Sequence, residues 1–151
     1  MKIVWKVKVK CVLVYSGVNW WNCLNNGEKV EKEDSIKIHR EGTALADVGK
    51  FGEAAEKYLR ASELYEKDKN FFDASYALFK AAECDYQLKD YETAKERFLK
   101  AAELAFLKGY DRFGVSALEY AVDCQKALGE EDQTKDLKQK IKEIKEKLQN
   151  Y

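Results

Sequence analysis

The chain has 151 residues and contains no proline, and its length suits one domain with a core of its own. Its 27 lysines and arginines balance its 27 aspartates and glutamates, so the formal net charge is zero. This balance argues against a general affinity for nucleic acid or for an anionic membrane.

The first 32 residues differ in composition from the rest of the chain. They hold all three tryptophans, and between Lys2 and Lys10 lysines alternate with apolar residues. This two-residue period predicts a strand or hairpin that packs on the first helices. An alternative is a non-native extension, with the native chain starting at Val30. A signal or membrane segment is disfavoured, because its short apolar runs cannot span a bilayer.

From residue 33 onward, apolar residues recur at the spacing of helices. Ala54, Tyr58 and Ala61 follow one another at intervals of four and three residues, which is one helical face. We therefore predict a helical domain over 33–151, after an N-terminal segment over 1–32. Six helices are predicted, near 34–47, 52–68, 71–88, 92–107, 111–128 and 132–149.

A repeat of 40 residues organises the helical part. Segment 49–67 aligns with segment 89–107, so that Tyr58 matches Phe98. Such a period is typical of a solenoid, in which stacked helix pairs share a continuous core and leave a groove free for partners. The predicted fold class is therefore all-α, an α-α superhelix of about three helix-turn-helix repeats.

The last predicted helix differs from the others. Leu137, Ile141, Ile144 and Leu148 form one apolar stripe, and almost every other residue is Lys, Glu, Asp or Gln. A solenoid needs a terminal helix with a polar outer face, and this helix fits that capping role. A short coiled-coil seam between two copies is the alternative.

Small and aromatic residues follow one order in the two clearest repeats. That order is Gly42, Phe51, Ala54, Tyr58 and Ala61 in the first, and Ala82, Tyr91, Ala94, Phe98 and Ala101 in the second. It resembles the tetratricopeptide repeat (TPR) family, and the long repeat with its paired alanines resembles the SNAP-like branch of that family. The pattern fades in the third unit.

The resemblance implies a concave groove lined by the first helix of each unit. The partner-binding residues that it implies are His39, Thr43, Asp47, Tyr76, Phe79, Glu83, Tyr86, Glu119 and Asp123. Their carboxylates make the groove acidic on balance, so we predict a protein or peptide partner with basic residues and an apolar anchor. The alternative for the aromatic members is a place in the core.

The sequence shows no arrangement of residues typical of catalysis. His39 is the single histidine, and no glycine-rich phosphate-binding loop is present. Cys84 and Cys124 occupy equivalent repeat positions beside alanines, and we predict that they are buried apolar residues rather than metal ligands. No enzymatic activity, cofactor or metal site is therefore predicted.

Together these patterns predict a cytoplasmic scaffold or adaptor that binds another protein, with no nucleic acid and no membrane as partner. One alternative is a self-associating structural module, a homodimer through the array ends or the last helix. Another, implied by the resemblance alone, is a SNAP-like factor in membrane trafficking or complex assembly.

Overall fold

The computed structural model describes residues 34–149, and all regular structure in this range is α-helical. The prediction of an all-α fold is confirmed. The strand or hairpin predicted within residues 1–32 lies outside the described residues. The helices are α2 (Ser35–Asp47), α3 (Phe51–Lys67), α4 (Phe71–Gln87), α5 (Tyr91–Leu107), α6 (Asp111–Leu128) and α7 (Glu131–Gln149).

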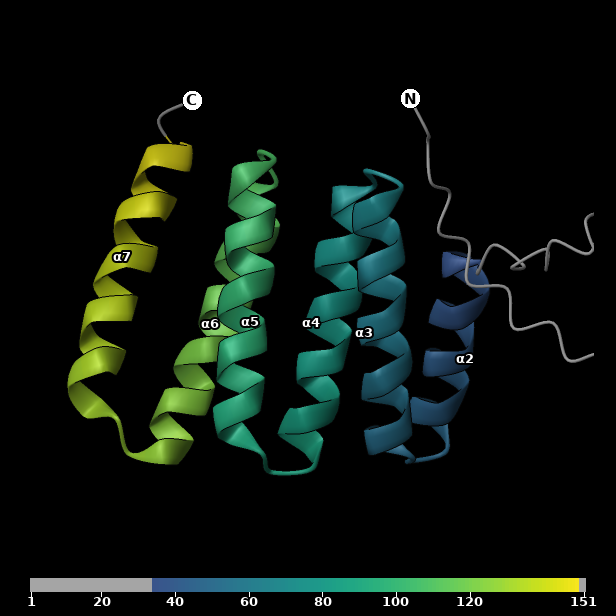
Figure 1. Ribbon diagram of the computed structural model, residues 1–151. Helices are drawn as coiled ribbons and strands as arrows, with labels where there is room; N and C mark the ends of the chain where they lie inside the picture. The colour runs from purple at the N-terminus through teal and green to yellow at the C-terminus, as the bar shows by residue number, and fades with distance from the viewer. Residues whose placement is uncertain (1–33, 150–151) are drawn as a thin grey trace, which may run out of the picture. The chain divides into compact units, whose positions relative to one another are not determined.

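The helices stack in sequence order as an open array (Figure 1). Each helix contacts chiefly the helices directly before and after it in the chain, and α2 and α7 lie at opposite ends. This order of contacts is that of a solenoid, in which each unit packs on its neighbours, and not that of a closed bundle. One long side of the array therefore stays free of helices.

Three of the helices begin with a side chain that caps the free backbone amides. The Oδ1 atom of Asp34 accepts a hydrogen bond from the amide of Ile36 at 2.9 Å, at the start of α2. Asn70 and Asp90 accept from the third residue beyond them, at the starts of α4 and α5. These short polar side chains are the preferred N-caps, so the sequence itself defines where these helices start.

Every connection between consecutive helices uses the same turn. A residue with positive φ stands at positions 49, 69, 89, 109 and 129, so the joints recur every 20 residues. The next amide then bonds the carbonyl five residues back, as from Lys50 to Leu45 at 2.9 Å and from Glu130 to Gln125 at 2.9 Å. This is the Schellman closure of a helix C-terminus. Three of the five positive-φ residues are glycines, but two are Lys69 and Lys89.

Replacing Lys89 by glycine is expected to raise the free energy of unfolding by about 1 kcal/mol, because a left-handed backbone strains an L residue and not glycine. The reciprocal change, Gly129→Lys, should lower it by a similar amount. Thermal denaturation should place the Lys89→Gly midpoint a few degrees above the parent, roughly 3–5 °C for a chain of this size. A lower midpoint for Lys89→Gly would show that the lysine stabilises the turn through contacts of its own.

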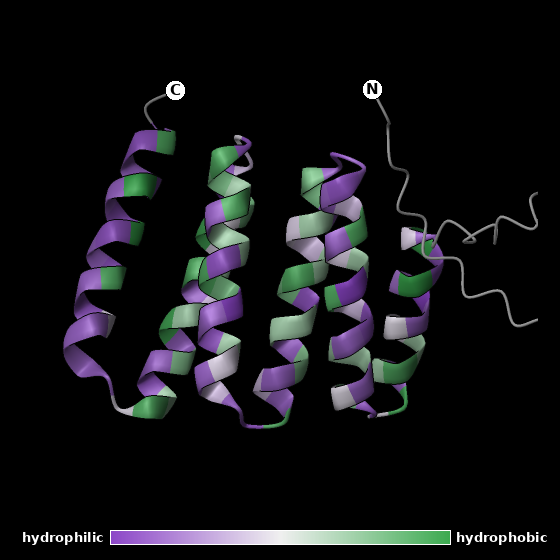
Figure 2. Ribbon diagram, in the orientation of Figure 1, coloured by the Kyte–Doolittle hydropathy of each residue, from purple (hydrophilic) through white to green (hydrophobic). Residues whose placement is uncertain are grey.

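Small residues let neighbouring helices approach, and aromatic residues fill the space beside them. Ala54, Ala61, Ala94 and Ala101 are completely buried, as the repeat predicted. A Cβ added to Gly42 would lie 3.1 Å from the ring of Tyr58, so glycine allows α2 to pack closely on α3. Figure 2 shows hydrophobic and hydrophilic faces alternating around these helices.

The last helix buries one side only. Ile141 is buried, and Leu137, Ile144 and Leu148 pack against the same core cluster. Figure 2 shows the rest of α7 as mostly hydrophilic. The predicted apolar stripe is thus occupied by contacts within the chain, which leaves α7 a polar outer surface and supports the capping role over the dimer seam.

Candidate functional site

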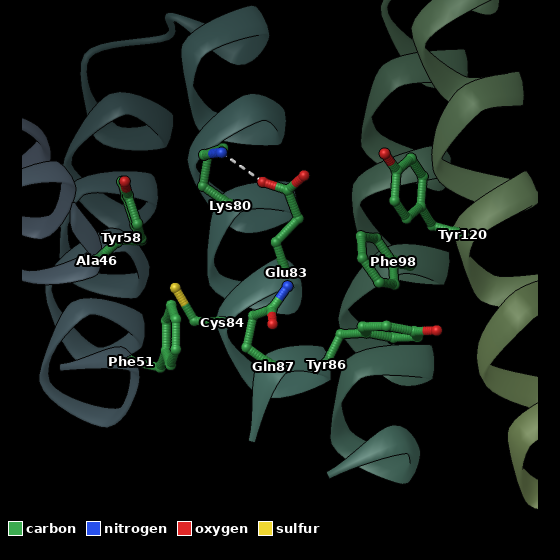
Figure 3. A pocket seen from close by; sticks show the side chains of 10 residues that line it. All are labelled: Ala46, Phe51, Tyr58, Lys80, Glu83, Cys84, Tyr86, Gln87, Phe98 and Tyr120. Carbon is green, nitrogen blue, oxygen red and sulfur yellow. Dashed lines mark hydrogen bonds and ion pairs between the residues drawn. The ribbon is translucent and has the colours of Figure 1, made fainter. Parts of the chain in front are cut away.

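A pocket of about 540 Å³ opens on the inner side of the array, between the C-terminal half of α4 and its neighbours. Figure 3 shows side chains from five helices converging on it. We call it the groove pocket. It is lined by Ala46, Phe51, Tyr58, Lys80, Glu83, Cys84, Tyr86, Gln87, Phe98 and Tyr120.

Aromatic rings form most of the wall of the groove pocket. Tyr58 and Phe98 are fully buried beneath it. The ring of Tyr120 stacks on Phe98, with centroids 5.2 Å apart and planes 28° apart, although 42% of Tyr120 stays exposed. The hydroxyl of Tyr58 donates to Oγ1 of Thr43 at 3.1 Å, and burial raises the pKa of that phenol. The pocket therefore has a rigid apolar floor and an accessible aromatic rim.

One ion pair supplies the charge in the groove pocket. The Nζ atom of Lys80 donates to Oε2 of Glu83, three residues along α4, and the two side chains are 32% and 30% exposed. Burial disfavours the charge on Lys80, but the hydrogen bond and the charge of Glu83 outweigh it and raise the lysine pKa. The pair is thus charged at neutral pH, and the pocket has no net charge.

Among the nine predicted binding residues, Glu83 and Tyr86 line the groove pocket. Thr43 bonds one of its walls, and Asp47 is exposed at the end of α2, next to the lining residue Ala46.

His39 and Tyr76 form a separate contact on α2 and α4. Their rings stack with centroids 5.9 Å apart and planes 11° apart. The rings of Tyr58 and Tyr65 meet the imidazole edge-on, and its Nδ1 is buried without a hydrogen bond. Burial lowers the pKa of His39, although Asp73 acts in the opposite direction. His39 is therefore a neutral, largely packed residue rather than a charged groove residue.

Phe79 was predicted to face the groove, and the structure places it in the core. It is only 8% exposed, and its ring lies 5.0 Å from those of both Phe98 and Tyr120. The reason is that Tyr120, from the next unit, covers the position that would otherwise open to solvent. Phe79 supports the pocket and does not line it.

Glu119 and Asp123 were also predicted to line the groove, and they lie elsewhere. They line a smaller depression between α6 and α7 together with Val122, Lys126, Lys138 and Ile141. Lys145 pairs with Glu119, and Lys126 pairs with Asp123 at 2.6 Å. With Glu83 also paired, the prediction of an acidic groove is wrong, because lysines of the chain itself neutralise these carboxylates.

Tyr120 and Lys80 are the lining residues that the sequence did not indicate. The residues 40 positions before Tyr120 and before Lys80 are Lys80 and Arg40, so a charged residue was the expectation at Tyr120. Tyr58 and Phe98 were read correctly as core aromatics. Their role as the floor of a pocket depends on how far the neighbouring helices stand apart, which no repeat pattern encodes.

The two cysteines in the described part of the chain are free and buried, as predicted. Burial raises the pKa of the Cys124 thiol to about 11, so it stays protonated and unreactive at neutral pH. Within residues 34–149, no three His, Cys, Asp or Glu side chains are placed to hold a metal ion. In the same range, no helix combines the length and the apolar character that crossing a bilayer requires.

The sequence matches one known protein family. The family model of the soluble NSF attachment proteins, SNAP, matches residues 26–151, a range that includes all six helices of the array. No solved structure is significantly similar to the chain. The match bears out the SNAP-like part of the predicted resemblance, while the narrower assignment to tetratricopeptide repeats stays a prediction.

Proposed function

Because the chain belongs to the family of soluble NSF attachment proteins, whose model matches most of its length, we propose that it is a non-catalytic adaptor. In this role it binds a segment of another protein on the free inner side of the array. The observation that carries the proposal is the groove pocket, which combines an aromatic rim with a single, partly exposed ion pair. Aromatic anchors next to a few oriented polar groups are typical of binding hot spots.

The lining of the groove pocket favours a helical partner segment over an extended one. An extended segment brings a backbone amide and carbonyl at each residue, and each needs a hydrogen-bond partner when it is buried. Here Lys80 and Glu83 already bond each other, and Thr43 already bonds Tyr58. A helix satisfies its own backbone and offers only side chains to the pocket.

The family name describes attachment of a protein called NSF. By analogy, a role in assembling or dismantling protein complexes is the second candidate, and it rests on the family match rather than on a contact in the structure. We place the protein in the cytoplasm, because the two described cysteines are free thiols, as a reducing compartment would keep them. Self-association is not favoured by the polar outer surface of α7.

The proposal predicts that the rim of the groove pocket decides partner binding. Proteins captured from the native source by the full chain should be lost, by at least about tenfold, with Tyr120→Ala, because one aromatic anchor carries several kcal/mol at such a site. The matched control is Tyr110→Ala, since Tyr110 is 38% exposed, close to Tyr120, but lies outside the pocket.

Quantitative mass spectrometry of the captured proteins measures this ratio, and light scattering of the purified chain accompanies it. Capture that Tyr120→Ala leaves unchanged would contradict the assignment of the binding site. A mass that doubles with concentration, and that Tyr120→Ala does not alter, would instead support the self-associating alternative.

A further inference from the structure

We propose that the groove pocket accepts an arginine side chain of the partner, whose guanidinium binds the free oxygen of Glu83 while its plane stacks on an aromatic wall. This inference rests on the proposed adaptor function and specifies what anchors the partner. It arises from the ion pair and the rings described above, and from what that pair leaves unsatisfied.

Glu83 uses only part of its capacity to accept hydrogen bonds. Oε2 accepts from Lys80, and Oε1 has no hydrogen bond to any residue in the described range. Figure 3 shows the carboxylate between Lys80 on one side and the rings of Phe98 and Tyr120 on the other. An ionised carboxylate accepts about four hydrogen bonds, so a donor from outside the chain can bind beside Lys80.

The rings decide which charge the pocket prefers. Lys80 has unused donors just as Glu83 has unused acceptor sites, so the ion pair alone would accept either an anion or a cation. Five aromatic residues line the pocket, however, and the face of each ring is negative. A cation over such faces is stabilised and an anion is repelled, so the surroundings favour a cation at Glu83.

Among cations, the geometry favours arginine over lysine. A guanidinium is planar, stacks on a ring and still directs its N–H groups to a carboxylate, whereas an ammonium is compact and strongly hydrated. The resident pair also competes weakly, because a pair three residues apart on an exposed helix contributes only a few tenths of a kcal/mol.

The other paired carboxylates of the chain lack this setting. Glu119 and Asp123 share a depression whose apolar lining is Val122 and Ile141, with no aromatic ring. They offer charge without a stacking surface. The juxtaposition of a half-satisfied carboxylate and an aromatic wall is thus particular to Glu83 among the carboxylates predicted to bind the partner.

The test uses the full chain as bait for a displayed library of random 12-residue peptides, followed by affinity measurement for each selected peptide. Each arginine-bearing peptide is also made with citrulline, which keeps the shape of arginine and removes its charge. Three variants are compared with the parent chain: Glu83→Gln, Lys80→Met and, as a matched control on the outer side of α5, Glu103→Gln. Tyr120→Ala identifies the peptides that bind the groove pocket.

The inference predicts opposite effects of two neighbouring substitutions. Arginine peptides should bind Glu83→Gln about tenfold or more weakly, since a hydrogen bond between charged groups is lost. They should bind Lys80→Met about two- to fivefold more tightly, since the competing cation is gone. The citrulline forms should bind about tenfold more weakly, and Glu103→Gln should match the parent.

Each other outcome has a definite meaning. Peptides that need Tyr120 but carry no arginine and ignore both substitutions would overturn this inference and leave the adaptor function standing. Peptides that bind Lys80→Met more weakly and Glu83→Gln more tightly would overturn it in favour of an acidic anchor. Selected peptides that ignore Tyr120→Ala altogether would contradict both the inference and the proposed binding site.

Discussion

Replacing Phe79 by alanine is expected to lower the free energy of unfolding by about 3–5 kcal/mol, the usual cost of removing a large buried ring. The ring is 8% exposed and contacts both Phe98 and Tyr120, so its loss leaves a cavity beneath the groove pocket. Urea denaturation followed by circular dichroism measures the change. Removal of Tyr86, which stands on the partly exposed rim, should cost clearly less.

The comparison separates support from recognition. Tyr86→Ala should weaken partner binding and largely preserve stability, whereas Phe79→Ala should reduce both together. A Phe79→Ala protein as stable as the parent would show that this ring faces solvent after all. The correction of Phe79 from groove to core would then be wrong.

Replacing Arg97 by leucine is expected to cost about 3–4 kcal/mol at neutral pH, because it leaves the buried carboxylate of Asp85 without its partner. Arg97 of α5 donates to Asp85 of α4, and their side chains are only 24% and 8% exposed. The double variant Asp85→Leu/Arg97→Leu should recover to within about 1 kcal/mol of the parent, since removing both charges removes the desolvation cost.

The repeats themselves supply the precedent for the double variant. Leucine already occupies both positions in neighbouring units, as Leu45 at the place of Asp85 and as Leu137 at the place of Arg97. Lys145→Leu serves as the control, because its pair with Glu119 is about half exposed and should contribute less than about 1 kcal/mol. A double variant as unstable as Arg97→Leu alone would contradict the account.

The pH dependence of Arg97→Leu provides a second check. Burial raises the pKa of Asp85, and Arg97 acts against it, so removing Arg97 should raise that pKa further. A carboxyl whose pKa is higher in the folded than in the unfolded state loses stability as pH rises between the two values. The deficit of Arg97→Leu against the double variant should therefore shrink as pH falls from about 7 toward 5.

The 40-residue repeat was sufficient to predict the helices. Each predicted helix end lies within one residue of the observed end. Two signals account for this accuracy. The apolar period places the buried faces, and glycine marks three of the five joints. At the other two joints a lysine adopts the left-handed conformation, and the 20-residue spacing was the signal that would have identified them.

The candidate site was predicted less completely, for physical reasons that differ between residues. The pairs Lys80–Glu83 and Asp123–Lys126 stand three residues apart on one helix, so their mutual neutralisation could have been predicted. The pair of Lys145 with Glu119 joins two helices 26 residues apart. Tyr120 is a rim residue only because its unit leans over the preceding one, and that depends on the packing of whole helices.

The uniform joint between helices has a consequence for how such a molecule can grow. Since every turn closes in the same way, a duplicated pair such as residues 71–110 would meet its new neighbours through joints that the chain already contains. Gene duplication could lengthen the protein in whole steps without inventing new linkers. Termination is then assigned to one place, the lysine- and glutamate-rich exterior of α7, where a further layer would find no greasy surface to cover.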